Sequence, residues 1–394
     1  MNKKIGIIGG GQLGKMMILE AKRLGLYIVT LDPDAECASS SISDELITAD
    51  LYDGAAIGEL AGKTDIITYE FEKINALALM ELEKKGHIIY PSAASLSIIQ
   101  DKYLQKSKLR ENGIKVPDFE PIDDYTALCE YAERSGYPIM LKARKNGYDG
   151  KGNCLVLSEP GLERGFNALR QVSEGLMAEE VIDFAMEVSV VAARAVNGQK
   201  AVYPIPYNVH KDNILDMMTV PAPLSEGLQA DIKEAAKKVM DVFEGVGTFC
   251  VEMFIGKNGE IYINEVAPRP HNSGHITIEG CRVNQFENHI RAILGLPLGS
   301  TELLHGGVIM RNLLGQGDGP AKIEGIEEAY KHDGVNIHVY GKRECKTGRK
   351  MGHYTITAAS LRQALETDAK IVGAVKITGG VRVKKHDEKG RIQL

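Results

Sequence analysis

Residues 248–275 have the sequence TFCVEMFIGKNGEIYINEVAPRPHNSGH, and this stretch decides the fold. Two apolar segments, 248–255 and 261–266, flank Asn258-Gly259, a pair typical of a hairpin turn. A two-residue turn there pairs Lys257 with Glu260, and the same register sets Glu252 directly opposite Glu265. We therefore predict two carboxylates on buried neighbouring strands, with Cβ atoms about 4.5–5.5 Å apart.

Two opposed carboxylates destabilise an apolar hairpin unless something neutralises them. A hard divalent cation does so, and Mg²⁺ commonly bridges carboxylates to phosphates. One protonated carboxyl, or a neighbouring Lys or Arg, is the alternative. Arg269, His271, Asn272, Ser273 and His275 follow at once in a turn stiffened by prolines, and they offer donors to anionic oxygens. No Ser-His-Asp or Cys-His arrangement can be placed, so we predict no nucleophilic triad.

The composition limits the class of protein. The chain has 394 residues, which suggests two or three domains at about 150 residues each. Hydrophobic residues make up 44% and charged residues 25%, which argues against extensive disorder. A net charge of −6 disfavours a general nucleic-acid binder. No apolar run reaches the roughly 18–20 residues of a membrane span, and six scattered cysteines without C-x-x-C indicate the reducing cytoplasm.

The order of patterns along the chain predicts mixed architecture. Strands at 5–8, 26–31 and 65–69, with a helix over 12–24, predict a small parallel sheet up to about residue 97. Short strands then dominate, with one long helix near 226–244, so the middle is expected to be α+β with antiparallel sheets. The last hundred residues are again mixed, with strands near 335–340, 353–358 and 372–384.

Two glycine-rich segments suggest phosphate binding. Gly9 to Gly14 fits G-x-G-x-x-G between a strand and a helix, and Asp32 ends the next strand, as in dinucleotide-binding domains. The alternative is a tight turn in a domain that binds no cofactor. Lys142 precedes the loop 147–152, whose glycines allow backbone N–H groups to approach a polyphosphate. The alternative there is a flexible surface hairpin.

A basic cluster lies near the C-terminus at Lys342, Arg343, Lys346, Arg349 and Lys350. It can hold a phosphate, although most charge runs are solvated loops. The cluster lacks interleaved aromatic residues, which disfavours single-stranded nucleic acid as a partner.

Together these segments resemble the ATP-grasp superfamily and, within it, the N5-carboxyaminoimidazole ribonucleotide synthases of purine synthesis. The resemblance spans nearly the whole chain, and the run from Asn264 to His275 is its most specific part. It rests on residues 9–14, 100–102, 142 with 147–152, 178–187, 208–212, the glutamate hairpin, 264–275 and 348–353.

The resemblance implies an ATP-grasp fold with α/β and α+β parts: a Rossmann-like pre-ATP-grasp domain over 1–97, an ATP-grasp domain over 98–295, and a mixed α/β domain over 296–394. It implies a cytoplasmic homodimer with ATP, Mg²⁺ and bicarbonate, and no nicotinamide, nucleic acid or membrane partner. The reaction would convert 5-aminoimidazole ribonucleotide into its N5-carboxy derivative through carboxyphosphate, releasing ADP and phosphate. A formate-dependent glycinamide ribonucleotide transformylase, an NAD(P)-dependent oxidoreductase and, more distantly, a pure binding module are the alternatives.

The resemblance also implies roles for residues. Mg²⁺ would be held by Glu252 and Glu265. Arg269 would stabilise the acyl-phosphate. The bicarbonate and acceptor region would contain His271, Asn272 and Ser273, and the aminoimidazole would face Tyr148 and Asp149. The ribonucleotide would contact Gln12, Glu70, Lys342, Arg349 and Lys350. The nucleotide would be held by Lys102, Lys142, Gly147, Tyr148, Asp149, Gly150, Lys151, Gly152, Asn153, Glu179, Glu180, Val181, Ile182, Glu187, His210, Asn264 and Glu265.

One departure from the superfamily concerns metal ligands. Many members have E-x-N, whereas Glu265 is followed by Val266 and Ala267. Asn264 precedes the glutamate instead, and strand alternation predicts that it points to the opposite face. The number of protein ligands to the metal is therefore left open.

Overall fold

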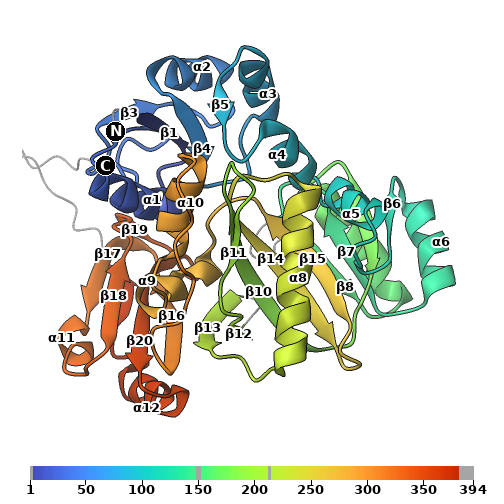
Figure 1. Ribbon diagram of the computed structural model, residues 1–394. Helices are drawn as coiled ribbons and strands as arrows, with labels where there is room; N and C mark the ends of the chain where they lie inside the picture. The colour runs from blue at the N-terminus through green and yellow to red at the C-terminus, as the bar shows by residue number, and fades with distance from the viewer. Residues whose placement is uncertain (1–2, 148–151, 212–213, 381–394) are drawn as a thin grey trace, which may run out of the picture. The chain divides into compact units, whose positions relative to one another are not determined.

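The computed structural model describes residues 3–147, 152–211 and 214–380 (Figure 1). The chain forms two compact units, residues 1–304 and 305–394, and each is described by itself. The division into three domains, with boundaries at residues 97 and 295, stays a prediction.

The first unit begins with a five-stranded parallel sheet in the order β3-β2-β1-β4-β5, as the alternating pattern predicted. Its strands are β1 (Lys4–Ile8), β2 (Tyr27–Asp32), β3 (Glu45–Thr48), β4 (Ile66–Tyr69) and β5 (Ile88–Ile89). The helices are α1 (Gln12–Arg23), α2 (Gly54–Lys63), α3 (Ala76–Lys84) and α4 (Ala93–Ile99). Asp53, Asn75 and Ser92 cap the last three helices through side-chain hydrogen bonds. Buried aliphatic side chains of the strands pack against these helices.

Two four-stranded antiparallel sheets follow, as expected for the middle of the chain. One has the order β6-β9-β7-β8: β6 (Phe119–Ile122), β9 (Leu176–Glu180), β7 (Ile139–Ala143) and β8 (Asn153–Val156). Side chains of α6 (Tyr125–Ser135) and α7 (Leu162–Arg170) share its core. The other has the order β11-β10-β14-β15: β11 (Lys200–Val202), β10 (Phe184–Arg194), β14 (Gly247–Gly256) and β15 (Ile261–Ala267). Side chains of α5 (Lys102–Glu111) and α8 (Glu226–Val242) share that core.

The β14–β15 hairpin turns differently from the prediction. Gly256 donates its N–H to Glu260 O at 2.8 Å, so the loop has three residues, and Gly259 adopts φ +82° as its left-handed residue. Lys257 therefore does not pair with Glu260, and Met253 lies opposite Ile263, one position out of the expected register. A β-bulge between Glu252 and Met253 then restores it. Glu252 lies opposite Glu265 as predicted, although the predicted two-residue turn is wrong.

The first unit contains further elements outside these three sheets. They are η1 (Glu159–Gly161), β12 (Tyr207–Lys211), β13 (Ile214–Val220), η2 (Asn272–Ile276), α9 (Thr277–Gly280) and α10 (Gln285–Ile293). His289 of α10 is fully buried, where it bonds Thr68 Oγ1 of β4 at 2.8 Å and accepts the N–H of Thr248 of β14 at 3.1 Å. This imidazole thus joins the parallel sheet to the sheet that carries the glutamates.

The second unit pairs its strands in the order β18-β20-β16-β21-β17-β19. The strands are β16 (Gly307–Gln316), β17 (Gly319–Glu324), β18 (Val335–Val339), β19 (Glu344–Cys345), β20 (Lys350–Ala358) and β21 (Lys376–Gly379). The helices are α11 (Ile326–Ala329) and α12 (Leu361–Ile371). Arg311 and Asp368 form a bidentate ion pair, at 3.0 and 2.6 Å, that ties α12 to β16.

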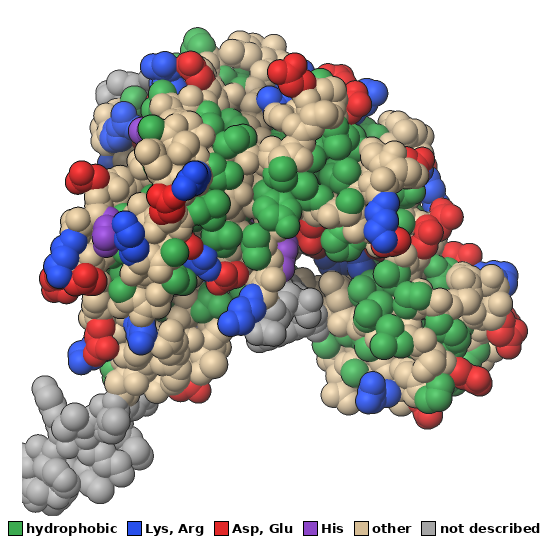
Figure 2. Space-filling view, turned by 90° about the horizontal axis from the view of Figure 1, so that it is seen from below, with side chains coloured by type: hydrophobic (Ala, Val, Ile, Leu, Met, Phe, Trp, Pro, Cys, Tyr) green, Lys and Arg blue, Asp and Glu red, His purple; other side chains and the backbone are tan. Residues whose placement is uncertain are grey.

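The surface carries both signs of charge, and Figure 2 shows Lys, Arg, Asp and Glu side chains interspersed on one face. Within the described part of the chain, no helix has both the length and the apolarity needed to cross a bilayer. All six cysteines are free thiols, and four of them are buried.

Candidate active site

Helix α5 is fixed by two sets of contacts, one to Arg144 after β7 and one to β15 of the glutamate hairpin. Asp101 caps it by accepting the N–H groups of residues 103 and 104, and it also receives two hydrogen bonds from Arg144, at 3.0 and 2.7 Å. Gln105 exchanges two hydrogen bonds with the backbone of Val266, at 3.0 and 2.9 Å. These contacts hold the lysines of α5 against the end of β15.

Lys102 is the first residue of α5, and its Nζ lies 2.5 Å from Glu265 Oε2. Burial alone would raise the pKa of Glu265, but Lys102, with Lys142 and Lys106, outweighs burial and lowers the pKa below its ordinary value. Glu265 is therefore ionised at neutral pH. A neighbouring lysine was the alternative to a metal ion for neutralising the two opposed glutamates. The structure has such a lysine for one of them, because Lys102 pairs with Glu265.

The predicted orientation of Asn264 is wrong. Lys142 Nζ donates to Asn264 Oδ1 at 3.2 Å, and the same ammonium lowers the pKa of Glu265. Asn264 and Glu265 therefore both face the lysines. The physical reason is the β-bulge, which sets an extra residue into β15 and breaks the alternation of side chains.

A fully buried carboxylate organises the lysines. Glu179 Oε1 lies 2.8 Å from Lys142 Nζ, and its Oε2 lies 3.0 Å from Lys106 Nζ. Burial opposes ionisation, but the two ammonium groups outweigh it and lower the pKa of Glu179. Lys142 of β7 was predicted to contact phosphates, and the structure places it beside Asn264 and Glu265. The side chain of Glu179 holds lysines, so any contact of this segment with adenine would use other atoms.

Arg269 follows β15 and is half-buried. Its Nη2 lies 2.7 Å from Glu72 Oε1, on the loop after β4, and its Nη1 donates to Pro270 O at 2.9 Å. Burial disfavours the charged guanidinium, but Glu72 outweighs this effect and raises the pKa of Arg269 above its ordinary value. The structure thus presents a permanent, half-buried cation next to the glutamate hairpin.

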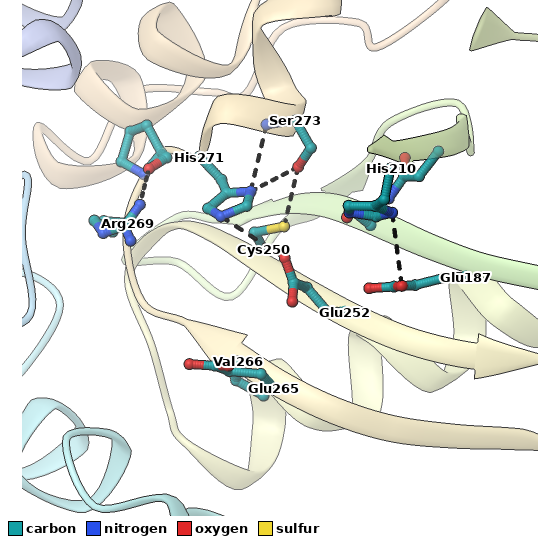
Figure 3. A network of polar contacts seen from close by, with 12 residues as sticks. Glu187, His210, Cys250, Glu252, Glu265, Val266, Arg269, His271 and Ser273 are labelled. Atoms are coloured by element: carbon teal, nitrogen blue, oxygen red, sulfur yellow. Dashed lines mark hydrogen bonds and ion pairs between the residues drawn. The ribbon is translucent and has the colours of Figure 1, made fainter. Parts of the chain in front are cut away.

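The loop after Arg269 lies against Glu252. Figure 3 shows His271 Nδ1 bonded to Ser273 Oγ at 2.7 Å, and Ser273 Oγ in turn lies 3.4 Å from Cys250 Sγ. The other ring nitrogen, His271 Nε2, lies 3.8 Å from Glu252 Oε1. Asn272 is buried in the same turn. His271 is therefore adjacent to one of the two glutamates, and Asn272 and Ser273 lie in the same turn.

The glycine-rich loop at Gly9 to Gly14 is filled by the chain's own carboxylates. Glu70 accepts the N–H of Gly14 at 2.6 Å and that of Gly11, while Asp32 accepts the N–H of Gly10 at 2.7 Å. Burial raises the pKa of Glu70, and the hydrogen bonds from Gly14 and Gly11 oppose that rise. The donors that would bind a dinucleotide pyrophosphate are therefore engaged, which argues against the NAD(P) alternative.

The other nucleotide residues occupy the surrounding strands and loops. Asn153 begins β8 opposite Lys142, and Gly152 packs tightly against Gly147 at the base of the β7–β8 loop. Glu180 ends β9 and is exposed, and it is followed by half-buried Val181 and Ile182. Tyr148, Asp149, Gly150 and Lys151 lie outside the described residues.

Glu187 and His210 were both predicted near the nucleotide, and the structure brings them together (Figure 3). His210 Nδ1 lies 3.7 Å from Glu187 Oε2. Burial raises the pKa of Glu187, and His210 opposes that rise.

The predicted ribonucleotide residues fall in both units. Gln12 begins α1 beside the loop that Glu70 holds. In the second unit, Lys342 Nζ donates to Lys350 O at 2.8 Å, and Arg349 Nη1 donates to Glu344 O at 3.1 Å. The structure therefore brings Lys342 and Lys350 into contact, while the role of all these residues stays a prediction.

Sequence reasoning missed several residues that organise the site: Glu72, Gln105, Lys106 and Arg144. Lys106 carried a usable signal, since it follows Lys102 by four residues on a predicted helix and so shares its face. The partners of Glu72 and Gln105 are distant in the chain, and only the fold reveals them.

The donor set fits a magnesium ion that is completed by a ligand's oxygens. Glu252 and Glu265 supply hard carboxylate oxygens from opposed positions. Across residues 3–147, 152–211 and 214–380, no cluster of three or more His, Cys, Asp or Glu residues is arranged to hold a metal. Two carboxylates leave most of an octahedral shell to water and phosphate, which is how Mg²⁺ is usually held beside nucleotides.

Comparisons with known proteins identify the same family along most of the chain. Family models match residues 1–100 as a ribonucleotide synthetase preATP-grasp domain, 107–286 as an ATP-grasp domain and 308–367 as a phosphoribosylaminoimidazole carboxylase C-terminal domain. N5-carboxyaminoimidazole ribonucleotide synthase from Staphylococcus aureus is 40% identical over 91% of this chain and 94% of its own length.

Solved structures give the same result. N5-carboxyaminoimidazole ribonucleotide synthetase from Thermotoga maritima has a TM-score of 0.87 and 41% identity over 96% of this chain and all of its own. The Aspergillus clavatus synthase, solved with ADP and 5-aminoimidazole ribonucleotide, has a TM-score of 0.86 and 33% identity over 95% of this chain and 98% of its own.

Proposed function

Because the chain belongs to the N5-carboxyaminoimidazole ribonucleotide synthase family, we propose that it carboxylates 5-aminoimidazole ribonucleotide with bicarbonate at the expense of ATP. The product is N5-carboxyaminoimidazole ribonucleotide, formed with ADP and phosphate, in purine biosynthesis. The enzyme is a ligase of the ATP-grasp type. The family assignment thus favours carboxylation over the transformylase and oxidoreductase alternatives.

One observation supports the proposal most directly. Glu252 and Glu265 oppose each other beside Lys102 and Lys142, and the half-buried Arg269 lies two residues after the end of β15. Phosphoryl transfer needs little covalent help from a protein, but it needs phosphates positioned and their charge neutralised. A cluster of cations around two carboxylates provides both. A hydride-transfer enzyme has no use for this arrangement.

We assign the residues as follows. Lys102 and Lys142 bind nucleotide phosphates, and Glu252 and Glu265 hold Mg²⁺, which when bound neutralises charge on the transferred phosphoryl group. Arg269 faces the acyl-phosphate oxygens as a cation whose charge does not depend on pH. His271, Asn272 and Ser273 orient bicarbonate and the acceptor amine. A homodimer remains part of the proposal, and light scattering that gives the mass of a single chain would contradict it.

The reaction proceeds in two steps. A bicarbonate oxygen attacks the γ-phosphorus of ATP, the bond to the β-phosphate oxygen breaks, and ADP leaves, which gives carboxyphosphate. The exocyclic amine of the ribonucleotide then attacks the carbon of carboxyphosphate and displaces phosphate, or it attacks the carbon dioxide that forms when carboxyphosphate loses phosphate. In both routes the amine nitrogen loses one proton, and the carbamate results. Carboxyphosphate hydrolyses in water, so the site must exclude solvent during the first step.

The test of the reaction is an ADP-release assay with the purified full chain. We expect product formation, coupled to ADP release, only when both bicarbonate and 5-aminoimidazole ribonucleotide are present. Formate in place of bicarbonate should give no product. Product with formate and glycinamide ribonucleotide would favour the transformylase alternative instead.

The test of the metal site is Glu265→Gln, with Glu260→Gln as the matched control on the exposed turn of the same hairpin. Removing one carboxylate charge from the site should lower ADP release by at least about 100-fold, on the scale of losing a key electrostatic group. The control should release ADP at the wild-type rate. Wild-type turnover by Glu265→Gln at limiting Mg²⁺ would contradict the assignment.

A further inference from the structure

Lys106 is a buried cation with no assigned role. Its side chain is 2% exposed, like that of Glu179, and its Nζ lies 3.0 Å from Glu179 Oε2 and 3.4 Å from Ile263 O. Burying an ammonium group is costly even when it is paired, and apolar side chains of similar volume are often no less stable. Packing alone therefore does not explain a lysine at this position.

The partner of Lys106 also holds a residue of the site. Glu179 uses one oxygen for Lys106 and the other for Lys142, at 2.8 Å, and Lys142 in turn reaches Asn264 at 3.2 Å. Glu179 thus divides its charge between two ammonium groups. Without Lys106, the whole of this buried negative charge would act on Lys142, and it would hold that ammonium away from anionic oxygens.

The balance of charge leads to the same conclusion. The described ammonium groups of this cluster belong to Lys102, Lys106 and Lys142, and the carboxylates that pair with them belong to Glu179 and Glu265. Glu252 lies opposite Glu265, so the three ammonium groups balance three carboxylates, and without Lys106 the cluster carries one negative charge in excess. A negative excess in a partly desolvated site repels a polyphosphate.

We propose that Lys106 is a positioning residue for ATP, which acts by taking half of the Glu179 carboxylate so that Lys142 can engage the phosphates. Lys106 does not itself touch the substrate. This inference depends on the proposed function, because it takes ATP as the ligand of Lys142.

The charged groups that face Lys106 are consistent with this role. Burial lowers the pKa of Lys106 to about 8, Glu179 opposes that shift, and Lys142 and Lys102 add to it. Lys106 contributes in turn to the low pKa of Glu265. The five side chains therefore behave as one electrostatic unit, in which a change at position 106 reaches the phosphate side of the cluster.

The test compares Lys106→Met with Lys106→Arg and with Lys108→Met, the same substitution on the same helix but outside the cluster. Calorimetric titration with MgATP measures affinity without turnover, so it separates this inference from the proposed reaction. We expect Lys106→Met to weaken ATP binding and raise the KM for ATP about tenfold, the effect of about 1.4 kcal/mol. The kcat and the KM for the ribonucleotide should change less than about threefold, and Lys106→Arg and Lys108→Met should stay near wild type.

A double variant guards against simple misfolding. Lys106→Met with Glu179→Gln removes the buried charges as a pair and leaves Lys142 without a carboxylate to hold it. We expect this double variant to bind MgATP at least threefold more tightly than Lys106→Met, and to bind it measurably even if Lys106→Met alone does not fold. Unchanged ATP affinity in folded Lys106→Met would overturn the inference, and so would a double variant that binds ATP tenfold more weakly than wild type.

Discussion

Acidification should destabilise the first unit through His289. The ring is fully buried, and burial lowers its pKa from an ordinary 6.5 to about 3. Nδ1 accepts the N–H of Thr248, so the neutral ring carries its proton on Nε2 and donates it to Thr68 Oγ1. A second proton would have to bind Nδ1, where it would point at the N–H of Thr248 inside the buried site. The folded protein therefore resists protonation of His289.

The sign and size of the effect follow from linkage. Between pH 3 and pH 6.5 the unfolded chain binds a proton at this residue and the folded chain does not, so stability falls as the pH falls. From pH 6.5 to pH 5 the loss is about 1.6 kcal/mol for this group alone. An entropy of unfolding of about 2.1 cal/mol/K per residue converts this loss, over a 304-residue unit, to a fall of about 2 or 3 °C in Tm.

The assay is thermal unfolding of wild type, His289→Gln and His305→Gln across this pH range. His289→Gln lowers stability at every pH, because it disturbs a buried contact, so the quantity to compare is the slope against pH. We expect a slope shallower by about 1.6 kcal/mol over the range in His289→Gln. The exposed imidazole of His305 serves as the control, and its variant should follow wild type. Parallel curves for wild type and His289→Gln would refute the reasoning.

Two further substitutions test the predicted binding segments. Gly152→Ala should reduce kcat/KM for ATP by about tenfold, the effect of about 1.4 kcal/mol, because the added Cβ would overlap the backbone of Gly147 at the base of the β7–β8 loop. The control is Gly62→Ala, whose added Cβ would meet open space. Equal effects of the two substitutions on kcat/KM would count against a tight loop. Arg349→Ala should raise the KM for the ribonucleotide more than the KM for ATP, and steady-state kinetics that show equal increases would argue against its phosphate role.

The glutamate hairpin shows both what sequence reasoning can reach and where it fails. Opposed carboxylates followed from an Asn-Gly turn, and the structure confirms the pairing. The assumed turn is wrong, since Asn258-Gly259 belongs to a three-residue loop, and a bulge at Asn264 cancels the shift. A turn type and a bulge each move the register by one residue, and the sequence signals neither strongly.

Fold class was easier to predict than side-chain partners. Strand and helix patterns are local, so the parallel sheet and the antiparallel middle of the chain were predicted correctly. Pairs such as Arg269 with Glu72 join residues almost two hundred positions apart, and no local pattern specifies them. The glycine motif was ambiguous for the same reason, because the carboxylate of Glu70 that fills it comes from a different strand.

The short segment after β4 has a consequence for engineering. Glu70 holds the glycine loop, Glu72 pairs with Arg269, and Lys73 Nζ donates to Asn146 O at 2.7 Å, where the loop before Gly147 begins. Three residues within four consecutive positions thus anchor three separate parts of the first unit. An epitope tag or fluorophore inserted here would displace all three together, whereas the exposed tip around Asn258 offers a place for such a graft without that penalty.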